Sequence, residues 1–191
     1  KELDLSRVFD TVKKSLPEKF FYNIEAIYVG DFAEMHEKQV NAMYKDGVIY
    51  LSNIQDDEDD MIDDIAHEVA HAVEEQYGMQ IYSDREIERE FLSKRMKLKT
   101  ILSTNQFDVS RYNFENIRFD PEFDEFLHQE IGYPHLVSLT GGLFYTPYSI
   151  SSIREYFAEV FEAYFFKKDL PILYKLSPKV IKKIESIMEE V

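Results

Sequence analysis

The stretch that most constrains this chain is His67-Glu68-Val69-Ala70-His71, in which two histidines stand four residues apart. On an α-helix, residues with this spacing lie on the same face, about one turn from each other. Both imidazoles can then reach one tetrahedral zinc ion, and Glu68 stands beside them where it can accept and return protons. The motif therefore calls for a helix at this point and predicts a zinc site on one of its faces.

The residues around the motif have the pattern of an amphipathic helix. Apolar side chains recur at helical spacing, at Ile62, Ile65, Ala66, Val69, Ala72, Val73 and Tyr77. The acidic run 56–60 precedes them, and negative charge is favoured at a helix N-terminus. Gly78 follows, and glycine is common just beyond the end of a helix. We therefore expect the motif helix to run from about residue 60 to residue 77.

The composition limits the classes of protein to which the chain can belong. Its 191 residues are 45% hydrophobic and 15% aromatic, which is enough for a sizeable core, and we expect one domain over 1–191. The net charge of −15 argues against nucleic-acid binding, because phosphate groups would be repelled. A basic or neutral peptide or protein partner suits this charge better. The absence of cysteine excludes disulfides, thiolate zinc ligands and cysteine nucleophiles.

No apolar run approaches the roughly 20 residues needed to cross a bilayer, so we expect a soluble protein without a membrane span. The other elements follow from periodicity and turn signals. Helices are expected at about 4–16, 83–102, 120–132 and 152–168, and from Ser177 to the C-terminus. Strands are expected at 24–32, 42–45 and 48–51, the last two forming a hairpin through Asp46-Gly47. Ser83 and Glu86 have the spacing of a capping box, whereas 104–119 and 133–151 should be loops. Short strands, then the motif helix, then further helices are typical of an α+β fold.

Two histidines leave a zinc ion short of a third protein ligand, the fourth position being kept for water. A metzincin-like continuation would place a histidine six residues after His71, and Tyr77 stands there instead, which excludes that class. The remaining histidines, His36, His128 and His135, are expected to be surface or satisfied core residues. A glutamate on a later helix is therefore the natural candidate for the third ligand.

Three glutamates compete for that role. Glu90 lies nineteen residues after His71, but the dense charges of 85–90 indicate an exposed helix with many ion pairs. Glu155 and Glu159 share one face of an aromatic-rich helix, where a carboxylate is costly unless it is paired or bound to metal. Ser152 and Glu155 also have the spacing of a capping box, which would engage the Glu155 carboxylate. Residue chemistry alone leaves Glu155 and Glu159 both open.

The motif, Tyr148 and the run Glu155-Tyr156-Phe157-Ala158-Glu159 together resemble the catalytic domain of anthrax lethal factor. They also resemble the small secreted Pro-Pro endopeptidases of the same clan. In that family a tyrosine stands seven residues before the zinc-binding glutamate. A second glutamate, four residues after the first, supports a zinc ligand.

Carried over position by position, the resemblance implies a zincin-like metallopeptidase fold with Zn²⁺ as cofactor. The zinc ligands would be His67, His71 and Glu155. Glu159 would support one of these ligands, and Tyr148 would lie near the substrate carbonyl. The zinc ligands of the two segments stand further apart in sequence than is usual for the family. The extra length falls in 84–140, which we interpret as an inserted helical element.

The predicted function is that of a zinc-dependent metalloendopeptidase. Glu68 would take a proton from a zinc-activated water and return it to the leaving amine. Tyr148 would help to stabilise the oxyanion. Val48–Leu51 is expected to be an edge strand that pairs with an extended substrate, and Asp63 or Asp64 is an alternative to Glu159 for orienting a zinc-bound imidazole.

Two other functions are compatible with the same resemblance. One is a catalytically silent binding domain, such as a toxin component or a virion protein. The other is an intracellular regulatory zinc protease that cuts a single partner. The resemblance to secreted enzymes favours secretion, whereas cleavage specificity and oligomeric state stay open at this point.

Overall fold

The computed structural model describes residues 3–166 and 168–189, and its architecture is α+β, as the sequence predicts. Contacts divide the chain into two compact units, with the boundary between Gly78 and Met79. The single domain expected over 1–191 stays a prediction, and residues 1–2, 167 and 190–191 lie outside the described part. No helix among the described residues is both long and apolar enough to cross a bilayer.

The first unit is built around a three-stranded mixed sheet. Its strands are β1 (Ala26–Gly30), β2 (Ala42–Lys45) and β3 (Val48–Ser52), in the spatial order β1-β3-β2. β1 is parallel to β3, whereas β2 is antiparallel to it and joined to it by the predicted hairpin. The turn residues Asp46 and Gly47 have φ of 49° and 81°, which is the left-handed pair that a type I′ turn requires.

The expectation that Val48–Leu51 lies at a sheet edge is wrong. β3 is the central strand and pairs with β1 on one side and with β2 on the other. Its inward side chains, Ile49 and Leu51, are fully buried, so the strand with the strongest apolar alternation takes the centre of the sheet. Within the described residues, the hairpin strand that lies at an edge of the sheet is β2 instead.

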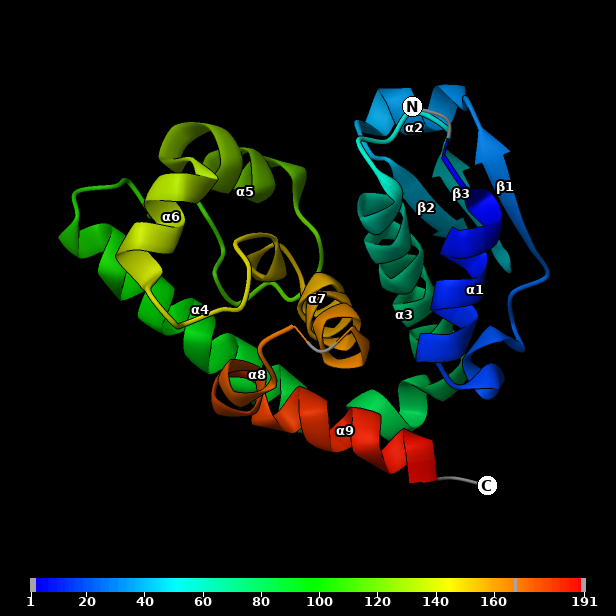
Figure 1. Cartoon of the computed structure of the whole chain (residues 1–191). Helices are drawn as coiled ribbons and strands as arrows, with labels where there is room; N and C mark the ends of the chain where they lie inside the picture. The colour runs from blue at the N-terminus through cyan, green and yellow to red at the C-terminus, as the bar shows by residue number, and fades with distance from the viewer. Residues whose placement is uncertain (1–2, 167, 190–191) are drawn as a thin grey trace. The chain divides into compact units, whose positions relative to one another are not determined.

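Three helices and one turn complete the first unit. They are α1 (Leu5–Ser15), a 3-10 turn (Glu18–Phe21), α2 (Ala33–Lys38) and α3 (Glu58–Tyr82), of which α3 runs past the unit boundary. In Figure 1 the sheet lies beside α1 and the first part of α3. The buried side chains of these elements form the core of the first unit and include Val8, Val12, Phe20, Ile49, Leu51, Met61, Ile65, Val69 and Val73. Burial of each such side chain contributes roughly 1.5–3 kcal/mol, which holds the motif helix in place.

The predicted end of the motif helix near residue 77 is confirmed, because the helical backbone is interrupted there. α3 continues to Tyr82 across a kink at Tyr77, whose φ of −113° and ψ of 17° are not helical. Ile81, one turn further on, is fully buried, so the apolar stripe extends beyond the glycine.

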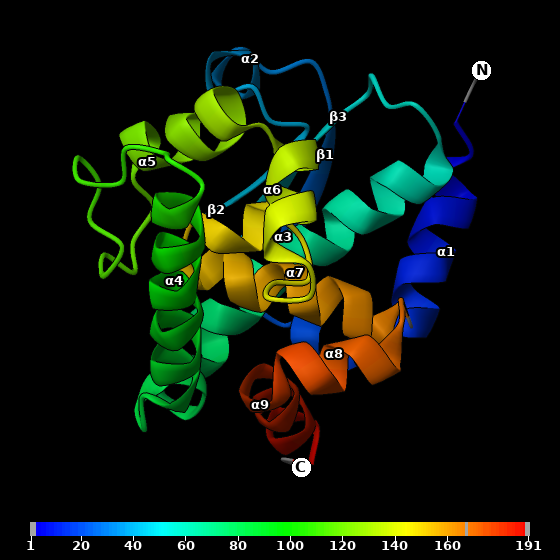
Figure 2. The same cartoon turned by 90° about the vertical axis from the view of Figure 1, so that its left-hand side faces the viewer.

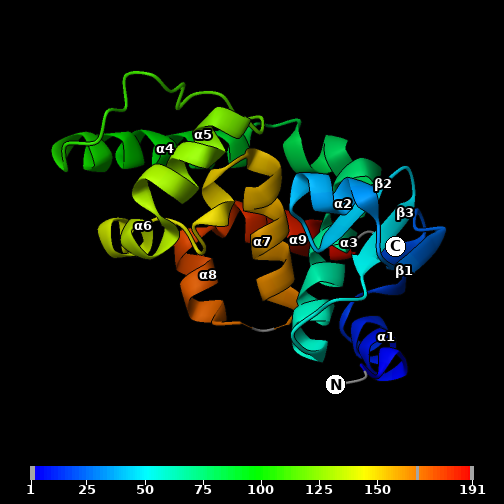
Figure 3. The same ribbon diagram turned by 90° about the horizontal axis from the view of Figure 1, so that it is seen from above.

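The second unit is helical. It contains α4 (Glu86–Thr104), α5 (Pro121–Glu125), a π-helical turn (Phe126–Ile131), α6 (Tyr133–Thr140), a 3-10 turn (Tyr148–Ile150), α7 (Ile153–Phe165), α8 (Leu170–Leu176) and α9 (Pro178–Glu189). The helix α7 packs against α4, α8 and α9, which lie around it in Figures 2 and 3. Its buried side chains include Tyr156, Phe157, Val160 and Phe161. α7 is therefore the central helix of this unit.

A buried arginine ties the irregular segment 104–119 to the turn that precedes α7. Arg95 on α4 is 1% exposed, and its guanidinium donates to the backbone carbonyls of Ile150 (3.0 Å) and Asn116 (3.3 Å). The same guanidinium lies 4.1 Å from the centre of the Phe123 ring. Hydrogen bonds and a cation–π contact thus offset the cost of burying this charge. They also fix the 3-10 turn at Tyr148–Ile150.

Several local predictions for the second unit are confirmed. The Asp120 side chain accepts from the N–H groups of Glu122 and Phe123 at the start of α5, and Gly132 closes the following turn with φ of 82°. Ser177-Pro178 precedes α9 as expected. α7 ends at Phe165, three residues before the predicted end at about 168, whereas the predicted end of α9 at the C-terminus involves residues 190–191, which are not described.

Other local predictions for this unit are wrong. Ser83 does not cap α4, because Arg85 takes the cap position with φ of 60° and Asp84 accepts from the Glu86 N–H at 3.0 Å. The loop expected over 133–151 contains α6 and the 3-10 turn. Pro134 lies in the first turn of α6, where its missing N–H costs nothing, and Leu136 of that helix is fully buried.

Candidate metal centre and catalytic residues

The two motif histidines lie on one face of α3, as their spacing predicts. Their ring centres are 5.0 Å apart and the ring planes are inclined by 81°. His71 is 9% exposed, because it belongs to the buried side of the helix. Two imidazoles at this separation provide two nitrogen donors of the kind that zinc binds.

Glu74 orients His71, and the sequence reasoning did not anticipate this residue. The His71 Nδ1 atom lies 2.8 Å from Glu74 Oε2, and both side chains are buried. With Nδ1–H donating to the carboxylate, the lone pair of Nε2 is left for a metal. The spacing of three residues along the helix was the available signal, since such neighbours share a helix face. Glu74 is therefore a rival to Glu159, Asp63 and Asp64 for the role of orienting a zinc-bound imidazole.

Glu68 is held by the edge of the sheet. It is 8% exposed, and its Oε2 atom accepts a hydrogen bond of 2.6 Å from the backbone N–H of Tyr44 in β2. The phenol of Tyr44 donates to Glu75, two turns further along α3. Burial, together with this carboxylate, raises the pKa of Tyr44 to about 12, so the phenol keeps its proton at neutral pH.

Asp64, one turn before the motif, lines an acidic cleft of about 500 Å³ in the first unit. Burial raises the pKa of its carboxyl to about 6, with a further contribution from Glu68, although Gln55 Nε2 donates to Asp64 Oδ2 at 2.8 Å. The other residues lining this cleft are Asn41, Ile54, Asp56, Asp60 and Asp63. Ionisation of Asp64 therefore works against folding above its raised pKa.

The Asp64→Asn substitution should reverse that effect. The pKa of Asp64 is about 6 in the folded state against 3.8 ordinarily, so the native state binds the proton more tightly. The free energy of unfolding should then fall as pH rises from about 4 to 6, and the variant should be more stable at pH 7 by about 1 kcal/mol, allowing for partial exposure. Urea unfolding of the metal-free protein at pH 4, 5, 6 and 7 checks this. The exposed Asp56→Asn should keep the wild-type slope, and an unchanged slope in Asp64→Asn would contradict the assignment.

In the second unit α7 carries Glu155 and Glu159 on one face, one turn apart. The Ser152 hydroxyl accepts from the Glu155 N–H at 3.2 Å, so Ser152 caps α7 as its position predicts. Both carboxylates are half-buried beside the fully buried Tyr156 and Phe157. The aromatic surroundings expected for these two glutamates are confirmed, whereas their roles stay predictions.

Tyr148 lies in the 3-10 turn before α7 and belongs to the same unit as Glu155. Burial raises the pKa of Tyr148 well above its usual range, and the nearby carboxylates of Glu155 and Asp124 add to the effect. Burial likewise raises the pKa of Tyr133, at the start of α6. Both phenols therefore keep their protons at neutral pH and can donate a hydrogen bond. Tyr133 and Asp124 come from the predicted insertion, and no sequence motif marked them.

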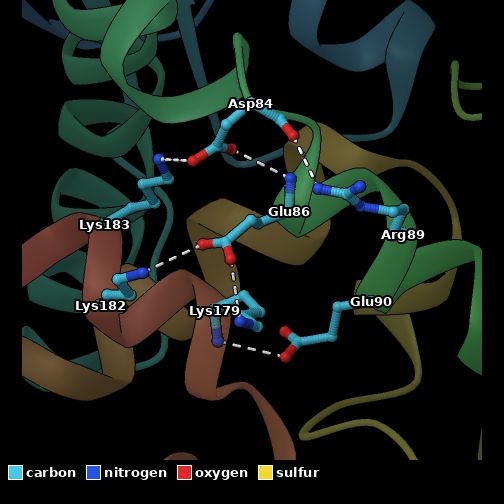
Figure 4. A network of polar contacts seen from close by, with 7 residues as sticks. All are labelled: Asp84, Glu86, Arg89, Glu90, Lys179, Lys182 and Lys183. Carbon is cyan, nitrogen blue, oxygen red and sulfur yellow. Dashed lines mark hydrogen bonds and ion pairs between the residues drawn. The ribbon is translucent and has the colours of Figure 1, made fainter.

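Glu90 has a structural role in the second unit (Figure 4). Its Oε1 atom accepts from the Tyr156 hydroxyl at 2.8 Å, and its Oε2 atom accepts from the Lys179 N–H at 3.1 Å in the first turn of α9. Figure 4 shows the ion pairs beside it, from Glu86 to Lys179 and Lys182 and from Asp84 to Lys183. The ion pairs predicted for 85–90 are confirmed, whereas the exposure predicted for this stretch is wrong, because Glu90 is half-buried and Ile87 is fully buried. Both oxygens of Glu90 are occupied, which weakens it as a zinc ligand.

The three histidines outside the motif are exposed, as predicted. His36 pairs with Asp31. The rings of His128 and His135 lie beside those of Tyr133 and Phe107, at centroid distances of 5.0 and 5.7 Å.

Comparisons with protein-family models, with curated proteins and with solved structures give no match. The zincin-like fold and the relationship to lethal factor thus stay predictions from the sequence. What the chain can do must be inferred from its own residues.

Proposed function

We propose that the protein is a zinc-dependent endopeptidase. The observation that carries the proposal is the arrangement on α3, where His67 and His71 stand side by side and Glu68 is the next residue. His71 and Glu68 each have the partner that this chemistry needs. Glu74 engages His71 Nδ1, and one oxygen of Glu68 is held by the Tyr44 N–H. Two surface histidines without a function would not need such support.

The donor set fits zinc. Two imidazole nitrogens and one carboxylate are the protein ligands of a well-known class of catalytic zinc sites. In the proposal His67 and His71 come from the first unit and the carboxylate from the second, with Glu155 as ligand and Glu159 in support. The choice of Glu155 rests on the family resemblance and on its distance in sequence from Tyr148. The hydrogen bonds that Tyr156 and Lys179 donate to Glu90 further favour Glu155 over Glu90 as the ligand.

The chemistry of the proposed reaction follows from these residues. Zinc bound there would lower the pKa of a water molecule to about 7 and polarise a peptide carbonyl. Glu68 would accept the proton of the attacking water and deliver it to the leaving amine. Tyr148 would donate a hydrogen bond to the developing oxyanion, for which its phenol must stay protonated. Its raised pKa supports that role.

The outer edge of β2, on which Glu68 already engages the Tyr44 N–H, supports a peptide as substrate. An extended peptide can add to an open sheet edge through main-chain hydrogen bonds. We therefore move the substrate-pairing role predicted for Val48–Leu51 to Ala42–Lys45, which is the edge strand beside the motif helix. The net charge of −15 favours neutral or basic peptides.

One experiment tests the proposal. The purified protein is profiled against a peptide library while its zinc content is measured. We expect about one zinc per chain, cleavage within peptides, loss of cleavage with a chelator and recovery on addition of zinc. A protein that binds no zinc would contradict the proposal. Zinc binding without any cleavage would favour the catalytically silent binding domain.

A further inference from the structure

Tyr44 connects the edge strand β2 to the motif helix by two hydrogen bonds. Its backbone N–H donates to Glu68 Oε2 at 2.6 Å, and its phenol donates to Glu75. The two glutamates are seven residues apart, which is about two helical turns, so they lie on the same face of α3. A single residue of the sheet thus contacts the helix at two points along its length.

The direction of the Tyr44 N–H follows from the strand register. Lys45 pairs with Val48 across the two-residue turn, and Tyr44 is opposite Ile49 in the next pair. In an antiparallel hairpin of this kind the second pair does not exchange hydrogen bonds, so the N–H of Tyr44 points away from β3. At a free edge such a group normally bonds to water or to another chain. Here the Glu68 carboxylate satisfies it.

This contact uses one of the two carboxylate oxygens of Glu68. Within the described part of the chain, Oε2 is bonded to Tyr44 and Oε1 has no hydrogen-bond partner. A glutamate side chain has three rotatable bonds, and a charge-assisted hydrogen bond to one oxygen restricts its orientation. The remaining oxygen is then presented in one direction, as a general base requires.

We propose that Tyr44 is a positioning residue for Glu68, its N–H orienting the carboxylate and its phenol, bound to Glu75, holding β2 against α3. The catalytic meaning of this contact rests on the proposed function. β2 is four residues long and, in the part of the chain that the structure describes, has a neighbouring strand on one side only. The bond from the phenol to Glu75 supplies the lateral restraint that a second neighbouring strand would otherwise give. A small shift of the strand would move the N–H and with it the Glu68 carboxylate.

Kinetics on a cleaved library peptide test the proposal. Tyr44→Phe and Glu75→Ala should each lower kcat about tenfold with KM nearly unchanged, well short of the roughly 10²-fold that a 1 Å misplacement costs. Glu75→Gln keeps an acceptor oxygen and should retain most of the rate. Tyr28→Phe removes an exposed phenol from the same sheet and should behave as wild type. An unchanged kcat in Tyr44→Phe, or an equal loss in Tyr28→Phe, would overturn the proposal.

Amide hydrogen exchange tests the contact without any substrate or metal. In the metal-free protein the Tyr44 amide should exchange slowly, Glu68→Ala should speed its exchange at least about tenfold, and Glu68→Gln should keep it slow. Equal exchange in wild type and Glu68→Ala would overturn the proposal, whatever the activity. Exchange that depends on Glu68 in a protein that cleaves no peptide would instead contradict the proposed function and leave the contact in place.

Discussion

Glu68→Gln is expected to abolish peptide hydrolysis while zinc stays bound. General-base catalysis contributes roughly 10²–10⁴-fold to a rate, and a neutral amide cannot accept the proton of the attacking water. The fold should survive, because the amide oxygen of glutamine can still accept the 2.6 Å hydrogen bond from the Tyr44 N–H. His67 and His71 are untouched, so their nitrogen donors remain. The measurements are kcat on a library peptide and zinc per chain by elemental analysis.

A matched control for this variant lies on the same helix. Asp59→Asn removes one carboxylate from the exposed first turn of α3 and should leave both readouts at the wild-type level. Hydrolysis by Glu68→Gln within a few-fold of wild type would show that this glutamate is not the base. Loss of zinc along with activity would show that Glu68 acts on the metal rather than on the proton.

The second large effect is expected from the glutamates that compete as third ligand. Glu155→Gln should cause the greatest loss of zinc affinity and of activity, because an amide oxygen is a much poorer zinc ligand than a carboxylate. Glu159→Gln should lower the zinc affinity about 10–100-fold, which is typical of a residue that supports a metal ligand. Competition with a chromogenic chelator gives the zinc affinity of each variant. A larger loss in Glu159→Gln than in Glu155→Gln would exchange their roles.

Glu90→Gln completes the series and separates metal binding from folding. Zinc affinity should be unchanged, because the Glu90 oxygens are bonded to Tyr156 and to the Lys179 N–H. Stability should fall by roughly 0.5–1.5 kcal/mol, since the amide has one acceptor oxygen and one of these two donors loses its bond to residue 90. Thermal unfolding of the metal-free protein measures this. Retained stability with lost zinc would make Glu90 the ligand.

Elements with a strong local signal were predictable from the sequence. The period of the apolar side chains places α1, α3, α7 and α9, and Asp46-Gly47 places the hairpin, because these signals depend on neighbouring residues only. The short helices α2 and α8 were not predicted, and α6 lies where a loop was expected. Each is six to eight residues long, too short for a periodic pattern to be distinguished from a loop.

The candidate site was likewise predictable from the sequence only where its signal was local. The spacing of His67, Glu68 and His71 alone indicated which side chains share a face of the helix. Their partners could not be read from spacing of this kind, except that Glu74 follows His71 by three residues. Tyr44 reaches Glu68 across 24 positions, and Glu90 reaches Lys179 across 89. Nothing in the local sequence ranks such distant donors against one another.

By itself, then, the sequence determined the helical motif, its proposed zinc chemistry and the hairpin beside it, because local geometry follows from residue type and period. Only the tertiary structure decided that β3 is central and that β2 lies at an edge of the sheet. It also decided that Tyr44 holds the candidate base and that Glu90 anchors α9. The physical reason is that a buried polar group is costly without a partner, and packing between elements distant in sequence determines which partner is within reach.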